Sequence, residues 1–504
     1  MIDLSSNEIT IIEKGDFRES TSLKILKLQN NLIRDIMDHA FKDLISLFFL
    51  DLSNNSITFV SLHHFISLKN LRYLFLNYNR INVIHAKAFS NLIALHTLDL
   101  SFNNMRYFAE GQFFGMESLQ NLYLQNNRIF SVNGMFWGLF NLKFLEVDEF
   151  SICCAKPRSR NHLQCVSPVN EIASCENLIS APVLNVAIWY IAFLATVGNI
   201  IALICSTSTF KRSSFAYFIF SRNLSVADFL MGIYLYIIAI TNLVYTGRYG
   251  FEDYSWRHSF LCTFAGILAT VSSEASALFV LMITIDRVVA IKNPFSRRNK
   301  VWVIGSSALA WVIAFSLAVF PVLPLKLSMF EDFYAQSPVC ISLPLSVHRQ
   351  LGWQYSMVIF IGLNFLIFLG IIFGQFLILY EVIKSGSNSQ ASNIRRREIT
   401  LAKTVVSVVV TDILCWIPIG ITGMLTFYGI DVTMEIYAWI IVLVLPVNSA
   451  INPILYTLTA IIRDRGRRKV SESNIQKEKE LLAQENSRLK QKLKIQRDST
   501  NSYM

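Results

Sequence analysis

Three carboxylates lie inside long apolar stretches of this sequence: Asp228 in "NLSVADFLMG", Glu274 in "SSEAS" and Asp412 in "TDILCWIPI". On insertion scales, each costs roughly 2.5–3.5 kcal/mol at the centre of a membrane, so each needs a proton, a cation or hydrogen-bond donors. Asp228 and Asp412 are therefore predicted to be functional, whereas Glu274 fits hydrogen bonding between helices equally well. Another apolar stretch contains "NSAINPILY" at 448–456, whose polar groups likewise need partners inside a membrane.

Seven apolar segments carry these residues, and they run roughly over 182–206, 214–240, 262–291, 302–325, 353–383, 400–427 and 436–459. Each segment is long enough to cross about 30 Å of hydrocarbon as a helix. Lys and Arg collect after the first, third and fifth segments and again in "RDRGRRK" at 463–469. A bias of this kind marks the cytoplasmic side. The pattern predicts an all-α bundle of seven transmembrane helices over 181–460, with the amino terminus extracellular and a cytoplasmic tail over 461–504.

Composition supports a membrane protein with more than one folded unit. The chain has 504 residues, of which 53% are apolar and only 16% charged. The net charge is +10, but the basic residues stand in short runs between apolar segments, so they orient the chain in lipid and do not indicate a nucleic-acid site. In the tail, a brief heptad pattern near Leu482 and Leu489 favours a solvated helix over a dimerising coiled coil.

The first 150 residues repeat with a period of 24: Asn recurs at 7, 31, 55, 79, 103 and 127 in the frame Leu-x-x-Leu-x-Leu-x-x-Asn. Phe17, Phe41, Phe65, Phe89 and Phe113 keep the same step, and Trp137 takes the next slot. The pattern is identified as the leucine-rich repeat, an α/β horseshoe in which Leu side chains fill one continuous core. We therefore predict a solenoid over 1–150. Because residue 1 falls inside a repeat, we expect the chain to be incomplete at its amino terminus.

The concave face of such a solenoid carries the side chains that lie between the strand leucines. Carboxylates and aromatic rings alternate there, and our candidates for ligand binding are Asp51, Phe75, Asp99, Tyr123, Glu146 and Asp148. A solvated face with scattered charge is the plainer interpretation of any one of them. Together they suit a basic peptide, because carboxylates attract Arg and rings add contact area. Asn54-Asn55-Ser56 is a predicted glycosylation acceptor at Asn54.

Four cysteines close the repeats, at Cys153, Cys154, Cys165 and Cys175. An open solenoid end exposes core, so a disulfide-held cap over 151–180 is expected, with its pairing undetermined. The cluster lacks a Cys-x-x-Cys pair with matching His, which argues against zinc.

The polar motifs of the seven segments resemble those of the rhodopsin-like G-protein-coupled receptors. The matching positions are Gly198-Asn199, Asp228, Cys262, Asp286-Arg287, Trp311, Cys415-Trp416-Ile417-Pro418 and Asn452-Pro453-Ile454-Leu455-Tyr456. This ordered series extends over all seven segments. Val288 departs from the pattern because a Tyr usually follows the Arg, and the fifth segment, "IGLNFLIFLG", lacks the usual Pro.

The resemblance implies a hydrated pocket that binds sodium in the inactive state, with Asp228 as the metal ligand. Its network is implied to contain Asn199, Asp228, Ser276, Trp416, Asn448, Ser449 and Asn452. An activation switch is implied at Asp286, Arg287, Asp412, Trp416, Pro418, Asn452, Pro453 and Tyr456, in which Asp286 holds Arg287 until a heterotrimeric G protein binds. A disulfide is implied between Cys262 and Cys340.

Repeats joined to such a bundle resemble the leucine-rich-repeat receptors, and "LPVNSAINPILYTLT" and "ADFLMGIYL" look most like the relaxin-family peptide receptors. The resemblance implies a relaxin- or insulin-like peptide ligand, a plasma-membrane location, G-protein coupling to adenylyl cyclase and, through phosphate-accepting tail residues, arrestin. It implies no cofactor beyond sodium, and no catalytic residue is predicted.

Other interpretations remain open on the sequence alone. A glycoprotein-hormone-type receptor is disfavoured by the short link from Cys153 to Ser180. A non-signalling decoy, a truncated isoform or an adhesion protein is the stronger alternative. An enzyme is disfavoured because no His pairs with a carboxylate at metal spacing inside the apolar segments and no nucleophile motif is present.

Overall fold

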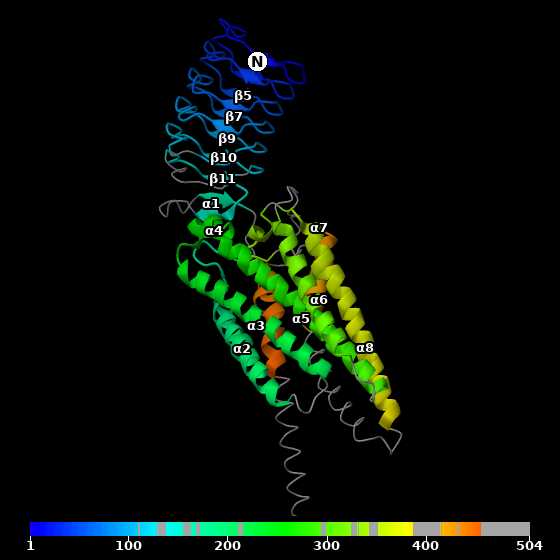
Figure 1. The fold of residues 1–504 in the computed structure, drawn as a ribbon. Helices are drawn as coiled ribbons and strands as arrows, with labels where there is room; N and C mark the ends of the chain where they lie inside the picture. The colour runs from blue at the N-terminus through cyan, green and yellow to red at the C-terminus, as the bar shows by residue number, and fades with distance from the viewer. Residues whose placement is uncertain are drawn as a thin grey trace, which may run out of the picture. The chain divides into compact units, whose positions relative to one another are not determined.

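The structure of this chain is a computed structural model. It describes residues 1–108, 111–127, 129, 138–154, 163–167, 172–209, 215–293, 299–323, 330, 332–341, 351–386, 414, 416–430, 432 and 434–454. The chain forms two compact units, Met1–Ala181 with Thr241–Ser259, and Pro182–Ile240 with Phe260–Met504. The predicted solenoid and the predicted helical bundle are both present (Figure 1).

Short parallel strands stacked in register build the solenoid. The described residues form one eight-stranded sheet from β1 (Ile2–Asp3), β3 (Ile25–Lys27), β5 (Phe49–Asp51), β7 (Tyr73–Phe75), β9 (Thr97–Asp99), β10 (Asn121–Tyr123), β11 (Phe144–Glu146) and β12 (Gln164–Val166). Two-stranded ladders add β2 (Ile11–Ile12) with β4 (Asp35–Ile36), and β6 (Phe59–Val60) with β8 (Val83–Ile84). The central Leu of each inner strand, such as Leu50, is fully buried, so each repeat covers its neighbour.

The repeated Asn residues hold the turns together. The Nδ2 of Asn55 donates to the Leu28 carbonyl at 3.0 Å and to the Leu52 carbonyl at 3.1 Å, and its Oδ1 accepts the Ile33 amide at 3.0 Å. Equivalent bonds recur at Asn31, Asn79, Asn103 and Asn127. The repeated Phe rings also stack from Phe17 to Phe89, with centroids 5.8–6.2 Å apart. Trp137, predicted for the sixth slot, lies outside the described residues.

The carboxyl end of the repeats is closed by a cap with two disulfides. A short helix, α1 (Phe150–Cys154), follows β11, and the bonds join Cys153 to Cys165 and Cys154 to Cys175. This confirms the disulfide-held cap and determines the pairing. The cap leaves none of these four sulfurs as a thiolate for zinc.

Helix α4 (Tyr249–Arg257) belongs to the same unit as the cap, although in sequence it lies between the second and third transmembrane segments. The Gly250 amide donates to the Cys175 carbonyl at 2.9 Å, and the Asn242 side chain accepts the Ile179 amide at 3.0 Å. A Cβ at Gly250 would lie 2.5 Å from the Cys154 Cβ, so this close approach requires glycine. Segment 241–259, which the sequence assigns to the bundle over 181–460, therefore packs with the cap.

The second unit is helical. Its long helices are α2 (Pro182–Thr209), α3 (Phe215–Val244), α5 (Phe260–Lys292), α6 (Lys300–Val319) and α8 (Asn364–Gly386). The 3₁₀ turns η2 (Phe320–Val322) and η4 (Phe333–Gln336), the short helix α7 (Trp353–Ser356) and the π-helical turn η5 (Met357–Leu363) lie before α8. Five helical stretches are long and apolar enough to cross a membrane within the part of the chain described here. The last two predicted segments contribute helical residues Trp416–Phe427 and Ile440–Ile454, the latter beginning with the π-helical turn η6 (Ile440–Val444) after α10 (Met434–Trp439).

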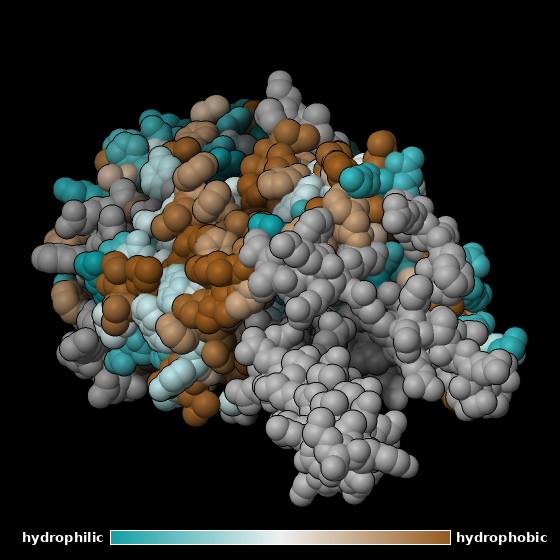
Figure 2. All heavy atoms as spheres, turned by 60° about the horizontal axis from the view of Figure 1, so that its bottom comes forward, coloured by the Kyte–Doolittle hydropathy of each residue, from teal (hydrophilic) through white to brown (hydrophobic). Residues whose placement is uncertain are grey.

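Helix α5 lies at the centre of this unit, packed against α6 and α8. Its inward side chains, such as Phe279 and Ile283, join a core that includes Phe220 of α3 and Ala314 of α6. Large apolar side chains point outward from the helices instead, as at Tyr190, Phe193 and Phe373. Figure 2 shows hydrophobic side chains gathered over much of the described surface in that view. Such a surface is suited to lipid.

Candidate ligand face and transmembrane switch

The predicted ligand residues on the solenoid form one row. The strand register aligns Asp51 with Phe75, Phe75 with Asp99, Asp99 with Tyr123, and Tyr123 with Glu146. Side chains at aligned positions of neighbouring strands lie on the same face. We call these five residues the acid–aromatic row. Tyr123 packs against Phe144, with ring centroids 5.4 Å apart, which adds an aromatic contact within the sheet.

Hydrogen bonds inside the sheet partly occupy the carboxylates of this row. One oxygen of Asp99 accepts from both the amide and the hydroxyl of Ser101, at 2.9 and 2.6 Å, and Asp51 contacts Ser53 in the same way. Burial raises the pKa of Asp99 above its usual value, despite the bonds from Ser101. Its remaining oxygen is a partly desolvated acceptor, which a cationic ligand group would stabilise.

Two neighbouring positions add unfilled acceptors. The side-chain oxygens of Asn77 and Gln125 are buried and have no hydrogen-bond partner among the described residues. Each residue lies two positions after a member of the acid–aromatic row, just beyond the end of its strand. Burying such groups without partners is unfavourable. The face is therefore rich in acceptors and suited to a ligand rich in donors.

Asp148 has a different setting. Its two carboxylate oxygens accept the backbone amides of Asn126 and Asn127, both at 2.7 Å. In the preceding repeats the equivalent amides donate to backbone carbonyls of the next repeat, as Asn54 does to Asn77 and Asn55 to Tyr78, and the Asp148 carboxylate takes over that acceptor role at the end of the ladder. The structure thus gives this predicted ligand residue a structural function. Asn54 is exposed on the solenoid, where its side chain donates to Asn30 at 2.7 Å.

In the helical unit, Asp228 of α3 is fully buried and gathers several of the predicted network residues. One oxygen accepts from the hydroxyls of Ser276 and Ser449, each at 2.9 Å, and the other accepts from Asn452 Nδ2 at 2.9 Å. Asn199 joins them by donating to the Ser449 carbonyl at 3.0 Å. Asn448 is also buried. Trp416 is half-buried and makes no hydrogen bond with Asp228 in the part of the chain that the structure describes.

The oxygen atoms around Asp228 are suited to coordinate a hard cation. Besides its carboxylate and the two hydroxyls, the amide oxygens of Asn199 and Asn452 are buried and lack partners among the described residues. Carboxylate, hydroxyl and amide oxygens are the ligands that such ions prefer. Close packing encloses this centre, because a Cβ at Gly198 would lie 2.9 Å from Pro453 Cγ.

Glu274, which lies on α5, is a second of the three intramembrane carboxylates singled out in the sequence, and it has a different partner. One oxygen accepts from Asn364 Nδ2 at 3.0 Å, and the second has no partner among the described residues. Asn364 directly follows the π-helical turn η5, and its Nδ2 also approaches the Ile359 carbonyl at 3.4 Å. Sequence analysis missed Asn364, although an Asn inside "IGLNFLIFLG" is itself an unusual polar residue in an apolar segment.

At the far end of α5, Asp286 and Arg287 form an ion pair, and both are buried. Val288 packs instead against Ile291 and Ile378. In the sixth segment, the Thr422 hydroxyl donates a hydrogen bond to the Pro418 carbonyl at 2.7 Å. Asp412, Cys415 and Tyr456, which belong to the predicted switch and motifs, lie outside the described residues.

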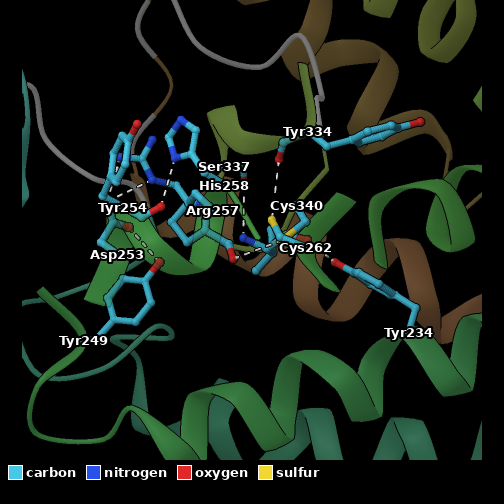
Figure 3. The surroundings of a disulfide bond; sticks show 12 residues. Tyr234, Tyr249, Asp253, Tyr254, Arg257, His258, Cys262, Tyr334, Ser337 and Cys340 are labelled. Atoms are coloured by element: carbon cyan, nitrogen blue, oxygen red, sulfur yellow. Dashed lines mark hydrogen bonds and ion pairs between the residues drawn. A yellow bond between two sulfur atoms is a disulfide. The ribbon is translucent and has the colours of Figure 1, made fainter. Parts of the chain in front are cut away.

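The implied disulfide between Cys262 and Cys340 is present (Figure 3). Two tyrosines fix the loop that carries Cys340: Tyr234 donates to the Val339 carbonyl at 2.9 Å, and Tyr334 donates to the Ala318 carbonyl at 2.7 Å. Burial raises the pKa of Tyr334 above its usual value. Asn223, part of a second sequon, accepts from the Trp311 indole at 2.8 Å inside the helical unit.

A leucine-rich-repeat solenoid followed by a bundle with a buried Asp228 centre and an Asp286–Arg287 pair defines a repeat-bearing membrane receptor. Comparison with family models agrees. The 7 transmembrane receptor (rhodopsin family) model matches residues 198–456, which is more than half of the chain, and the leucine rich repeat model matches 21–81 and 70–129. The chain therefore belongs to the rhodopsin family of seven-transmembrane receptors. It is a multi-pass plasma-membrane protein of a non-enzymatic family.

Individual relatives are similar over the same region. The chain is 38% identical over 328 residues to "G-protein coupled receptor GRL101" of Lymnaea stagnalis, which covers 64% of this chain and 29% of that protein. It is 32% identical over 329 residues to "Relaxin receptor 2" of Canis lupus familiaris, covering 64% and 44%, and 32% identical over 325 residues to "Relaxin receptor 1" of Mus musculus, covering 64% and 42%. The matched regions thus span less than half the length of these relatives.

Proposed function

We propose that this chain is a receptor for a relaxin- or insulin-like peptide, which binds the concave face of the repeats and activates a heterotrimeric G protein that acts on adenylyl cyclase. The observation that carries this proposal is the acid–aromatic row, flanked by the unfilled oxygens of Asn77 and Gln125. A peptide that presents Arg side chains supplies donors to the carboxylates of this row, and Phe75 and Tyr123 supply apolar contact area.

Helix α4 supports a path from the ligand to the bundle. Arg257 Nη2 lies 2.7 Å from both Glu149 and Asp253, so the helix is tied by charge to the residue just before α1. Tyr249 also donates to Asp253 at 2.7 Å (Figure 3). The pKa of Arg257 is raised by these carboxylates. Since segment 241–259 is continuous with the second and third transmembrane helices, a ligand that shifts the cap pulls directly on their ends.

The cytoplasmic response follows from the bundle. Sodium at Asp228 stabilises the arrangement in which Ser276, Ser449 and Asn452 converge, and the Asp286–Arg287 pair holds Arg287 away from a partner. Peptide binding shifts the population toward a state without these contacts, which exposes Arg287 to the G protein. Glycosylation at Asn54 is compatible with its exposed position.

The test is peptide binding and G-protein activation in cells that display the chain. We expect Asp99→Ala and Glu146→Ala each to weaken binding of a relaxin-like peptide about tenfold, because each removes a charge-assisted hydrogen bond. Glu117→Ala is the matched control, since Glu117 is an exposed carboxylate outside the strand row. Unchanged affinity in both row variants contradicts the ligand face, and binding without any G-protein response favours a decoy or adhesion protein.

A further inference from the structure

Arg287 is a charged side chain with no exposed surface. Removing a guanidinium from water is strongly unfavourable unless several partners replace the lost hydration. Asp286 is one such partner, but it is the neighbouring residue on the same helix and moves with Arg287. A contact that keeps Arg287 inside the bundle must come from another helix.

Tyr217 of α3 provides that contact. Its ring lies beneath the Arg287 guanidinium, with 4.9 Å between the ring centroid and the guanidinium carbon. A cation above an aromatic face at this distance is attracted by the ring quadrupole. Tyr217 is itself held in place, because it packs against the core that contains Phe220 and Phe279.

The residue after Arg287 contacts a different helix. Val288 packs against Ile291 and Ile378, so the side chain that directly follows Arg287 contributes to the apolar contact with α8. An aromatic partner for Arg287 is thus provided across the helix interface. The sequence has Val288 where a Tyr usually follows the Arg, and in the structure Arg287 of α5 contacts the ring of Tyr217 of α3.

We propose that Tyr217 is a positioning residue that holds Arg287 in the inactive arrangement through its aromatic face, and thereby sets the ligand-free activity toward the G protein. This inference rests on the proposed coupling to a G protein. Breaking the contact requires Arg287 to leave the ring of α3, so activation must include a change between α3 and α5 at their cytoplasmic ends. The part of Tyr217 that matters is the ring, which Phe shares and Leu lacks.

The experiment compares three variants of the full chain in lipid nanodiscs: Tyr217→Leu, Tyr217→Phe and Phe218→Leu. Phe218 is the matched control, because it is the next residue of α3 and its ring pairs with Arg222 of the same helix, 5.4 Å from ring centroid to guanidinium carbon. Nucleotide exchange on purified G protein is measured without peptide. We expect Tyr217→Leu to raise exchange about tenfold, as the loss of a partly buried cation–π contact predicts, and both other variants to stay within about twofold of the parent.

The outcomes separate this inference from the proposed function. Asp286→Asn, which removes the ion pair with Arg287, is a further control. If Tyr217→Leu and Phe218→Leu give equal nucleotide exchange while Asp286→Asn gives faster exchange, the role of Tyr217 is overturned and G-protein coupling is left intact. If no variant, Asp286→Asn included, stimulates exchange, the proposed function fails. Thermal unfolding then tests the contact itself: Tyr217→Leu and Arg287→Gln, singly and together, should have non-additive effects. Additive effects contradict the contact.

Discussion

At the level of single residues, the role of a buried carboxylate depends on how many hydrogen-bond donors contact it. Asp228 receives three side-chain donors, Asp148 receives two backbone amides, and Glu274 receives one amide nitrogen. The same side-chain chemistry thus serves a predicted ion site, the end of a backbone ladder and a link between helices. Counting carboxylates in the sequence identifies where partners are needed, but it does not distinguish these three roles.

Asp228 yields a prediction about sodium removal. Purified receptor in nanodiscs should unfold at a higher temperature in NaCl than in choline chloride at equal ionic strength, because an ion that binds only the folded state stabilises it. A stabilisation of roughly 0.5–1 kcal/mol corresponds to a difference of about 1–2 °C for a helical unit of this size. Asp228→Asn should abolish the difference, and Ser276→Ala should reduce it. If Asp228→Asn retains the full sodium effect, the ion binds elsewhere.

At the scale of elements, the repeats are predictable because each satisfies the same local requirement. Asn55 and Asn79 each donate to carbonyls of their own and the preceding repeat and accept an amide of the preceding repeat, so their spacing alone reveals their bonds. Irregular residues within this regular frame are informative. His64 is one of them: it lies beside Phe65 in the stacked Phe series and accepts the Ser61 amide at 3.2 Å.

His64 predicts an acid-sensitive solenoid. Burial lowers its pKa from the usual 6.5 to about 4. Between these values the unfolded chain binds a proton that the folded repeats do not, so the free energy of unfolding falls as pH falls, by up to about 1.4 kcal/mol per pH unit. This contribution to stability is complete above pH 6.5. His64→Asn should flatten the slope in denaturant unfolding between pH 6.5 and 4, whereas exposed His85→Gln should keep it. Equal slopes in the parent and His64→Asn would show that other groups control the transition.

At the scale of the whole molecule, the segment that joins two transmembrane helices is also part of the solenoid cap. Asn242, Gly250 and Arg257 contact Ile179, Cys175 and Glu149 respectively, across wide separations in sequence. The cap and the bundle are thus linked twice by the chain, once through the residues before Pro182 and once through α4. This double connection is the route by which we propose that a bound peptide acts on the helices.

Arg257 tests that route. Arg257→Glu should leave peptide affinity within about twofold, because it lies outside the acid–aromatic row, while it lowers the maximal G-protein response severalfold by placing like charges against Glu149 and Asp253. The double variant with Glu149→Arg should recover part of the response. Cell-surface binding and cyclic AMP accumulation measure the two effects separately. A full response from Arg257→Glu would exclude this ion pair from coupling.

The sequence by itself determined the solenoid, its period, the apolar segments and the residues that line one face, because these follow from local periodicity and from the cost of polar groups in lipid. Aligned strands placed Asp51, Phe75, Asp99, Tyr123 and Glu146 in the row that spacing predicted. The folded structure was needed for the pairing of the four cap cysteines, the structural use of Asp148, the partner of Glu274, the ring under Arg287 and the assignment of segment 241–259 to the unit of the cap. Each of these depends on which distant residue reaches a given atom, and hydrogen bonds and ion pairs are short-range contacts that no single-chain pattern encodes.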